Sequence, residues 1–111
     1  MRISFEWDGS KSDTCYQQRG FDFAYASRVF DDLGKIIVED RRWGYRERRY
    51  QVLGRIEGRL FIIVYTIRPG RIRIISARKA NYREVKAYET GLYEPPEGPH
   101  RCGAGRRYFG R

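Results

Sequence analysis

The chain has 111 residues, of which 41% are apolar and 15% are aromatic, and its formal net charge is +9. This length fits one domain, and the apolar content excludes disorder throughout the chain. Two cysteines are too few for a disulfide framework or a structural zinc site. The longest strictly apolar run, 60–65, is far shorter than the roughly 18 residues of a membrane helix, so we expect a cytoplasmic protein with no membrane partner.

Positive charge is concentrated in the second half of the chain. Residues 41–90 carry 14 basic and 4 acidic side chains, whereas residues 21–40 carry 2 basic and 5 acidic side chains. A basic region of this kind favours a nucleic-acid partner.

The first 20 residues predict a strand followed by a helix. Residues 2–7 alternate between polar and apolar, which puts three apolar side chains on one face of a strand: Ile3, Phe5 and Trp7. Asp8 can then cap a helix of about three turns. Gly20 is suited to end that helix because it has no Cβ and readily adopts a left-handed conformation.

A second helix and a group of strands are expected next. The helix spans 22–32, and its apolar residues form one stripe: Phe23, Ala26, Val29 and Phe30. From residue 34 the apolar period changes to two, with four strand-like runs at 36–38, 50–53, 60–67 and 72–75. Turn signals at 41–45, 57–58 and 68–70 separate these runs, so they predict a meander of four antiparallel strands.

The run 60–65 is apolar at every position, as is typical of a strand covered on both faces. A last helix is expected over 80–90, with Asn81 as its cap and a partial apolar stripe of Tyr82, Val85, Ala87 and Tyr88. Residues 91–111 contain three prolines and five glycines, which predicts a flexible or partner-ordered tail after a domain at 1–90. We therefore expect an α+β fold, with helices packed on one antiparallel sheet.

Two sets of motifs resemble a known family. The first is Phe5-Glu6-Trp7-Asp8 followed by Lys11. The second comprises Leu53-Gly54-Arg55, Gly58-Arg59-Leu60, Val64-Tyr65-Thr66 and Ile72-Arg73-Ile74-Ile75-Ser76-Ala77-Arg78, followed by Ala80, Glu84 and Tyr88-Glu89. Together they span about residues 4–90 and resemble the BrnT-type toxins of bacterial toxin–antitoxin pairs. Two positions depart from that family: Gln18-Arg19-Gly20 replaces its common Lys-His-Gly, and Trp43 stands where a loop histidine is frequent.

The resemblance implies a RelE-like ribonuclease fold and an endoribonuclease toxin that inhibits translation and growth. It implies RNA cleavage by attack of a ribose 2′-hydroxyl on the adjacent phosphate, without a metal or other cofactor. It also implies a cognate ribbon–helix–helix antitoxin, similar to BrnA, whose complex with the toxin binds operator DNA. The single histidine, His100, lies in the tail, which excludes a mechanism that needs a histidine inside the domain.

Five residues are candidates for this chemistry. Arg78 leads, because its planar guanidinium can hold a phosphate with two hydrogen bonds, whereas Lys11 would provide a point charge. Glu84 and Tyr88 are four residues apart and therefore share a helix face, where they could serve as base, acid or orienting groups. The alternative is that Tyr88 belongs to the core and Glu84 pairs with an arginine. Glu47 is a further candidate base, or else part of a surface ion-pair cluster.

Arginines and aromatic residues of the basic half are candidates for binding RNA. Arg71 and Arg73 alternate with isoleucines and therefore share one strand face, and the same spacing relates Arg46 and Arg48. Aromatic rings between arginines can stack on unpaired bases. The candidates are Arg46, Arg48, Arg49, Arg71, Arg73, Trp43 and Tyr45. The alternative is a set of core aromatics with solvated arginines.

Two further functions fit the same residues. One is a non-catalytic module that binds RNA or DNA, which the absence of a domain histidine favours. The other is a protein that has lost cleavage and still binds its antitoxin. Cleavage of RNA by the purified protein distinguishes the toxin from both.

Overall fold

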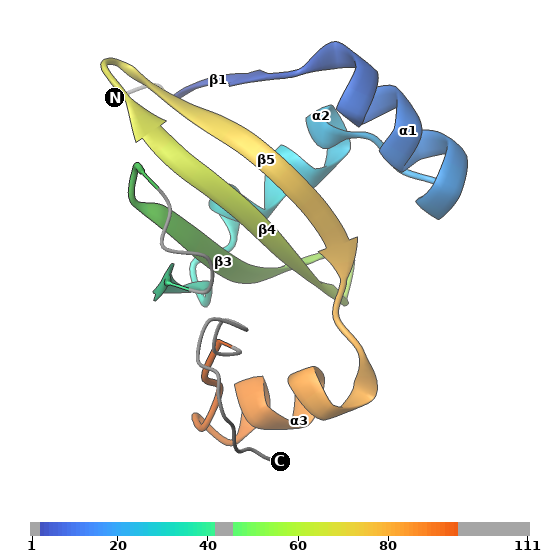
Figure 1. The fold of residues 1–111 in the computed structure, drawn as a ribbon. Coiled ribbons are helices and arrows are strands. Elements are labelled where there is room, and N and C mark those ends of the chain that lie inside the picture. Colours follow the sequence, from blue (N-terminus) through green and yellow to red (C-terminus); the bar gives the residue numbers. More distant parts are fainter. Residues whose placement is uncertain (1–2, 42–45, 96–111) are drawn as a thin grey trace, which may run out of the picture.

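The computed structural model describes residues 3–41 and 46–95, which form a five-stranded sheet with helices on both faces (Figure 1). The strands are β1 (Ser4–Trp7), β2 (Ile36–Asp40), β3 (Arg49–Ile56), β4 (Arg59–Arg68) and β5 (Arg71–Lys79), in the order β1-β5-β4-β3-β2. Strands β2 to β5 form the expected antiparallel meander. The α+β prediction is confirmed.

Strand β1 makes the sheet mixed, which corrects the expectation of a purely antiparallel sheet. It pairs in parallel with β5, with Phe5 opposite Ile72 and Trp7 opposite Ile74. Parallel neighbours need a long connection, and here the whole helical segment and the other three strands lie between the two. Phe5 and Trp7 pack on the core as the alternation predicted, while Ile3 is 51% exposed.

The first helix, α1 (Gly9–Arg19), is capped at both ends by the residues expected from the sequence. The Asp8 side chain accepts hydrogen bonds from the backbone N–H groups of Ser10 and Lys11, at 2.9 and 3.3 Å. Gly20 ends the helix at a φ of 87°, a conformation that L side chains rarely adopt. Both local predictions are confirmed.

The single helix expected over 22–32 is instead a short helix, α2 (Phe23–Ala26), followed by a 3₁₀ segment, η1 (Ser27–Asp31). In 3₁₀ geometry, residues three apart lie directly above one another, so Val29 faces the sheet as Ala26 does. All four residues of the predicted apolar stripe are buried. The apolar stripe is therefore confirmed, although a short α-helix and a 3₁₀ segment replace the single α-helix.

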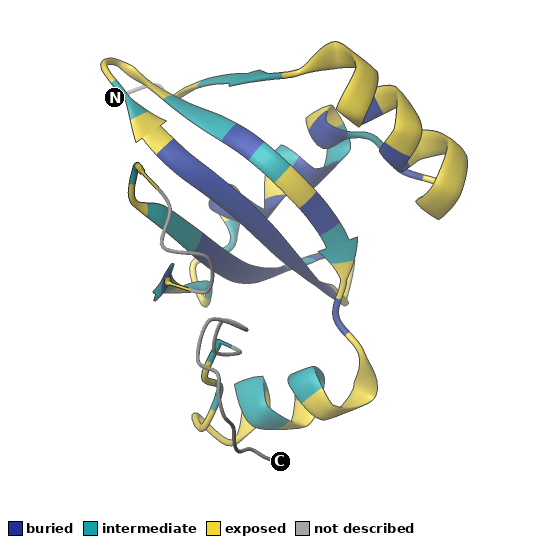
Figure 2. Ribbon diagram, in the orientation of Figure 1, coloured by how far each residue is buried: buried dark blue, intermediate teal, exposed yellow. Residues whose placement is uncertain are grey.

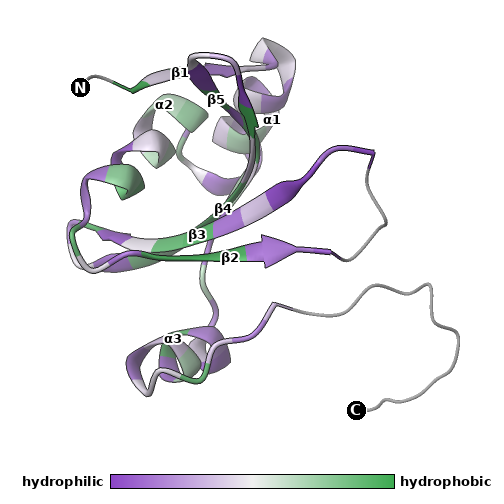
Figure 3. Ribbon diagram, turned by 90° about the vertical axis from the view of Figure 1, so that its left-hand side faces the viewer, coloured by the Kyte–Doolittle hydropathy of each residue, from purple (hydrophilic) through white to green (hydrophobic). Residues whose placement is uncertain are grey.

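Strand β4 is covered on both faces, as its apolar run predicted. Every residue from Leu60 to Thr66 is buried, and Figure 2 shows this buried band along the middle of the sheet. On one face, Phe61, Ile63 and Tyr65 join the core beneath α1, α2 and η1. On the other, Leu60 and Ile62 join a second cluster beneath α3 (Tyr82–Glu89). Figure 3 shows α2 and α3 on opposite sides of the sheet.

Helix α3 begins with a capping box, in which the Asn81 side chain accepts from the Glu84 N–H and the Glu84 carboxylate accepts from the Asn81 N–H. Val85 and Tyr88 pack on the second cluster as predicted. Tyr82 does not, because it is 74% exposed and lies beside the Lys86 ammonium. The predicted stripe is wrong at this position.

The tail expected from residue 91 lies mostly outside the described residues, apart from 91–95. In that part, Tyr93 packs on the second cluster and donates a 2.5 Å hydrogen bond to the Gln51 side chain. No helix in the described ranges is long and apolar enough to cross a membrane.

Gly54 permits the closest contact between the sheet and the helical layer. A Cβ at this position would lie 2.6 Å from Val29 Cγ2 and 3.0 Å from the Val29 carbonyl oxygen. The Asp32 carboxylate fixes the same approach, because its Oδ2 accepts from the Arg55 N–H at 2.7 Å. Gly54, part of the Leu53-Gly54-Arg55 motif, therefore allows η1 to pack closely on β3.

We expect Gly54→Ala to lower the free energy of unfolding by about 1–3 kcal/mol, because η1 must move away from β3. The matched control is Gly9→Ala in the first turn of α1, where an added Cβ meets nothing within 4 Å. That variant should keep or slightly raise stability, since alanine is the better helix former. Urea unfolding of both variants gives the comparison, and equal stabilities would contradict the packing role.

Candidate functional site

A row of polar side chains follows β5 on the sheet face opposite α1 and α2. Ile72, Ile74 and Ala77 belong to the core beneath those helices. Arg71 and Arg73 therefore lie on the opposite face, as their alternation with isoleucines predicted. The row, which we call the arginine row, consists of Arg71, Arg73, Ser76 and Arg78.

A bulge places Arg78 in this row. The pairing of β4 with β5 shifts between Val64 and Tyr65, which face Ser76 and Ile74, so Ile75 is an extra residue. With a strict period of two, residues 74, 76 and 78 would share the face covered by α1 and α2. The extra residue reverses the alternation from Ser76 onward and brings Arg78 to the same face as Arg73.

Glu6 holds the first two arginines of the row. Its register position on β1 is opposite Arg73, and its carboxylate binds Arg71 Nε at 2.5 Å and Arg73 Nη1 at 3.1 Å. Hydrogen bonds from Arg71, and then from Arg73, lower the pKa of Glu6. Glu6 was not singled out from the sequence, although it occupies a polar position of the alternating first strand and lies within the quoted Phe5–Asp8 motif.

Glu84 holds the last arginine of the row. The Arg78 guanidinium donates two hydrogen bonds to the Glu84 carboxylate, at 2.8 and 2.7 Å. The same carboxylate closes the capping box of α3 at Asn81, so one side chain joins the end of β5 to the start of α3. The hydrogen bonds from Arg78 are the largest cause of a lowered pKa at Glu84, and burial opposes them.

Tyr88 shares the helix with Glu84 but contacts a different part of the sheet. Its hydroxyl donates a 2.7 Å hydrogen bond to the Gly34 carbonyl, in the loop before β2, and its ring packs on the second cluster. The Arg55 guanidinium lies 5.6 Å from the centre of this ring and pairs with Glu89 at 3.0 Å. This geometry gives Tyr88 a part in anchoring α3.

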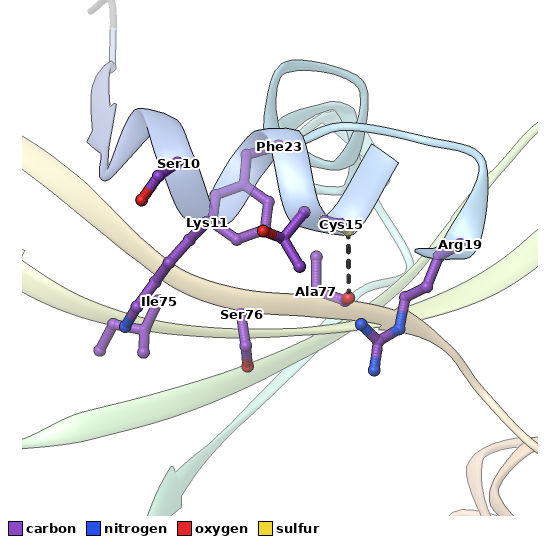
Figure 4. A pocket seen from close by; sticks show the side chains of 9 residues that line it. Ser10, Lys11, Cys15, Arg19, Phe23, Ile75, Ser76 and Ala77 are labelled. Carbon is purple, nitrogen blue, oxygen red and sulfur yellow. Dashed lines mark hydrogen bonds between the residues drawn. The ribbon is translucent and has the colours of Figure 1, made fainter. Parts of the chain in front are cut away.

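The remaining catalytic candidates lie away from Arg78. Glu47 forms ion pairs with Arg68 at 3.3 Å and with Arg49 at 3.9 Å, where β3 begins and β4 ends. Lys11 lies on α1 beside Ile75, in a pocket between α1 and β5 (Figure 4). The structure therefore brings Arg78 and Glu84 together, and it places Lys11, Glu47 and Tyr88 at three other points around the sheet.

The segment before β3 also differs from expectation. Arg46 and Arg48 are exposed, but β3 begins at Arg49, so both residues precede the strand and do not share a strand face. Trp43 and Tyr45 fall outside the described residues, as does His100. Within 3–41 and 46–95, no three His, Cys, Asp or Glu side chains form a group that could hold a metal ion.

The sequence model of one protein family, described as "Ribonuclease toxin, BrnT, of type II toxin-antitoxin system", matches residues 7–84. The chain belongs to this family. The resemblance drawn from the motifs is thereby confirmed. The matched range extends from β1 to the first turn of α3 and contains both Arg78 and Glu84. A search of curated proteins found no match.

The Arg78–Glu84 pair predicts a specific acid sensitivity. The folded pKa of Glu84 lies below its ordinary value of 4.5, so its stabilising effect is complete above about that pH and is lost as pH falls through the folded pKa. We expect Glu84→Gln to be less stable than the original chain at pH 7, and the difference to shrink as pH falls below 4.5. Urea unfolding at pH 7, 4 and 3 measures this convergence.

Glu94→Gln is the matched control for that experiment, because Glu94 is an exposed glutamate. It should leave stability unchanged at each pH. A stability difference for Glu84→Gln that stays constant from pH 7 to pH 3 would show that the carboxylate charge contributes nothing through Arg78.

Proposed function

We propose that this member of the BrnT family is an endoribonuclease toxin that cleaves RNA without a metal, by attack of a ribose 2′-hydroxyl on the adjacent phosphate. The observation that carries the proposal is the Arg78–Glu84 pair at the end of the arginine row. The match to a family of ribonuclease toxins supports the class of reaction.

The reaction builds negative charge on the phosphate, and a guanidinium held in place before substrate arrives can stabilise that charge without reorganising. Arg78 meets this requirement, since two of its nitrogen atoms are fixed on Glu84 while 39% of its side chain remains exposed. Glu84 acts here as a positioning residue, because a carboxylate with a lowered pKa is a weak proton acceptor. Ser76 and then Arg73 follow Arg78 along the same face and would bind the flanking part of the RNA strand.

Carboxylates neutralise much of the row before RNA arrives. Three arginines share two glutamates, Glu6 and Glu84, at ion-pair distances. The row thus presents oriented N–H donors more than net charge, which favours recognition of phosphate geometry over general attraction of polyanions. Arg46 and Arg48, both exposed, would add unspecific attraction at the edge of the sheet.

We infer that the toxin acts in the cytoplasm, where cleavage of RNA inhibits translation and growth, and that a cognate antitoxin neutralises it. A ribbon–helix–helix antitoxin similar to BrnA is the partner we propose, with the complex binding operator DNA. The description of the matched family as belonging to type II toxin–antitoxin systems supports a protein antitoxin.

The decisive test is Arg78→Ala. We expect cleavage of a bulk messenger RNA by the purified protein to fall by about 10²–10³-fold, the usual effect of removing one donor that stabilises transition-state charge. Growth inhibition on expression should disappear with it. The matched control is Arg83→Ala, which removes an exposed arginine of α3 that lies outside the arginine row. This control should stay active.

Both variants should retain the circular dichroism spectrum of the original chain, which shows that a loss of activity does not come from unfolding. A folded Arg78→Ala protein that remains fully toxic would overturn the role of Arg78. An original chain that binds RNA tightly and leaves it intact would instead identify a non-catalytic binding module.

Salt dependence tests the contacts of the row with RNA phosphates. We expect affinity for single-stranded RNA to fall as salt rises, because phosphate contacts release counterions. Arg73→Gln should reduce the slope of log affinity against log salt by about 0.7, the value for one lost phosphate contact on a single strand. Fluorescence anisotropy at several salt concentrations measures the slope. An unchanged slope would place Arg73 outside the RNA contact.

A further inference from the structure

Two cations of α1 differ from five arginines of the sheet. Arg55, Arg68, Arg71, Arg73 and Arg78 each have a glutamate within 4 Å. In the described part of the chain, Lys11 and Arg19 have no carboxylate at ion-pair distance. They are eight residues apart, which separates them by about 12 Å along the helix axis and about 80° around it.

Both cations line a pocket between α1 and the outer edge of β5. The pocket has a volume of about 380 Å³, and Figure 4 shows Lys11 at one end beside Ile75 and Arg19 at the other. It exists because β1 pairs with β5 only as far as Ile74, so α1 borders the rest of this strand edge. The Cys15 thiol, which donates to the Ala77 carbonyl at 3.7 Å, holds the helix against the strand.

The chemistry of the lining suits an anionic ligand with an apolar part. Ile75 provides apolar surface beside the buried Phe23 and Ala77, and Ser10, Thr14 and Ser76 provide polar atoms. None of the nine lining residues is acidic. The volume lies in the usual range for sites that hold a small molecule or one unit of a polymer.

A second pocket, of about 450 Å³, provides the contrast. Arg59 and Lys79 line it, but so do Asp22 and Glu57. Its positive charge is therefore balanced within its own wall, and an anion would meet repulsion there as well as attraction. Of these two pockets, the one beside α1 is the better site for a phosphate, because its lining carries positive charge without acidic side chains.

Ser76 connects this pocket with the arginine row, because it belongs to both. Its side chain points away from α1, toward the face that carries Arg73 and Arg78 (Figure 4). A nucleic-acid strand lying on the row can thus continue over the free edge of β5 into the pocket, whose lining contains no acidic side chain.

We propose that the pocket between α1 and β5 binds one nucleotide of the RNA strand next to the cleavage site, with its two flanking phosphates on Lys11 and Arg19 and its base or ribose on Ile75. This inference rests on the proposed function, since it extends the strand held by the arginine row. It makes Arg19, which stands where the family commonly has a histidine, a binding residue of this chain.

The test measures binding apart from cleavage. An RNA oligonucleotide methylated at every ribose 2′-oxygen lacks the attacking hydroxyl and so remains intact. Arg19→Gln and Lys11→Gln should each weaken its binding by about tenfold, the size expected for one charge-assisted hydrogen bond. The matched control, Arg59→Gln, removes the same charge from the acid-balanced pocket and should leave binding nearly unchanged. Equal losses of affinity in all three variants would show that any surface cation contributes the same, and would overturn the proposal.

Amide chemical shifts locate the ligand. Titration with the methylated oligonucleotide should move the signals of Ile75, Ser76 and Ala77, whereas adenosine 5′-monophosphate at the same concentration should move them far less. Unmoved signals would show that the pocket stays empty, and equal shifts with the mononucleotide would assign it to free nucleotides; either result overturns the strand assignment. Shifts at these residues in a protein that fails to cleave unmodified RNA would contradict the proposed function and leave the pocket assignment standing.

Discussion

One extra residue in β5 determines which side chains of this strand face away from α1 and α2. Strand β5 must direct Ile72, Ile74 and Ala77 into the core under α1 and α2, yet these residues are spaced by two and then by three. Only a bulge reconciles that spacing with a continuous pair of strands. The burial of Ala77, its contact with Cys15 on α1 and the exposure of Ser76 all follow from this irregularity.

The two glutamates that meet the arginine row come from opposite ends of the chain. Glu6 is on the strand added in parallel at the sheet edge, and Glu84 is in the first turn of the last helix. Each carboxylate keeps the guanidinium groups in fixed orientations, and each has its pKa lowered by them. The site is therefore organised by residues that stabilise the fold at the same time, so its geometry exists before any ligand binds.

Local features of this fold follow from the sequence, because their causes lie within a few residues. The Asp8 and Asn81 caps, the left-handed Gly20 and the apolar stripe at 23–30 are of this kind. The bulge and the parallel pairing of β1 depend on a neighbouring strand that periodicity within one segment does not specify. The same limit applies to the site: Arg78 and Glu84 were identifiable singly, whereas Glu6, Ser76 and Arg19 gain their significance from partners distant in sequence.

The parallel strand pair also imposes an order on folding during synthesis. The contact between Glu6 and Arg73 closes a loop of 67 residues, longer than any hairpin of the meander. While the ribosome extends the chain from its N-terminus, β1 has no partner until β5 has emerged, and the Glu84 contact with Arg78 follows later still. The arginine row, our proposed phosphate contact, is thus assembled only after the segment from β5 to α3 has emerged.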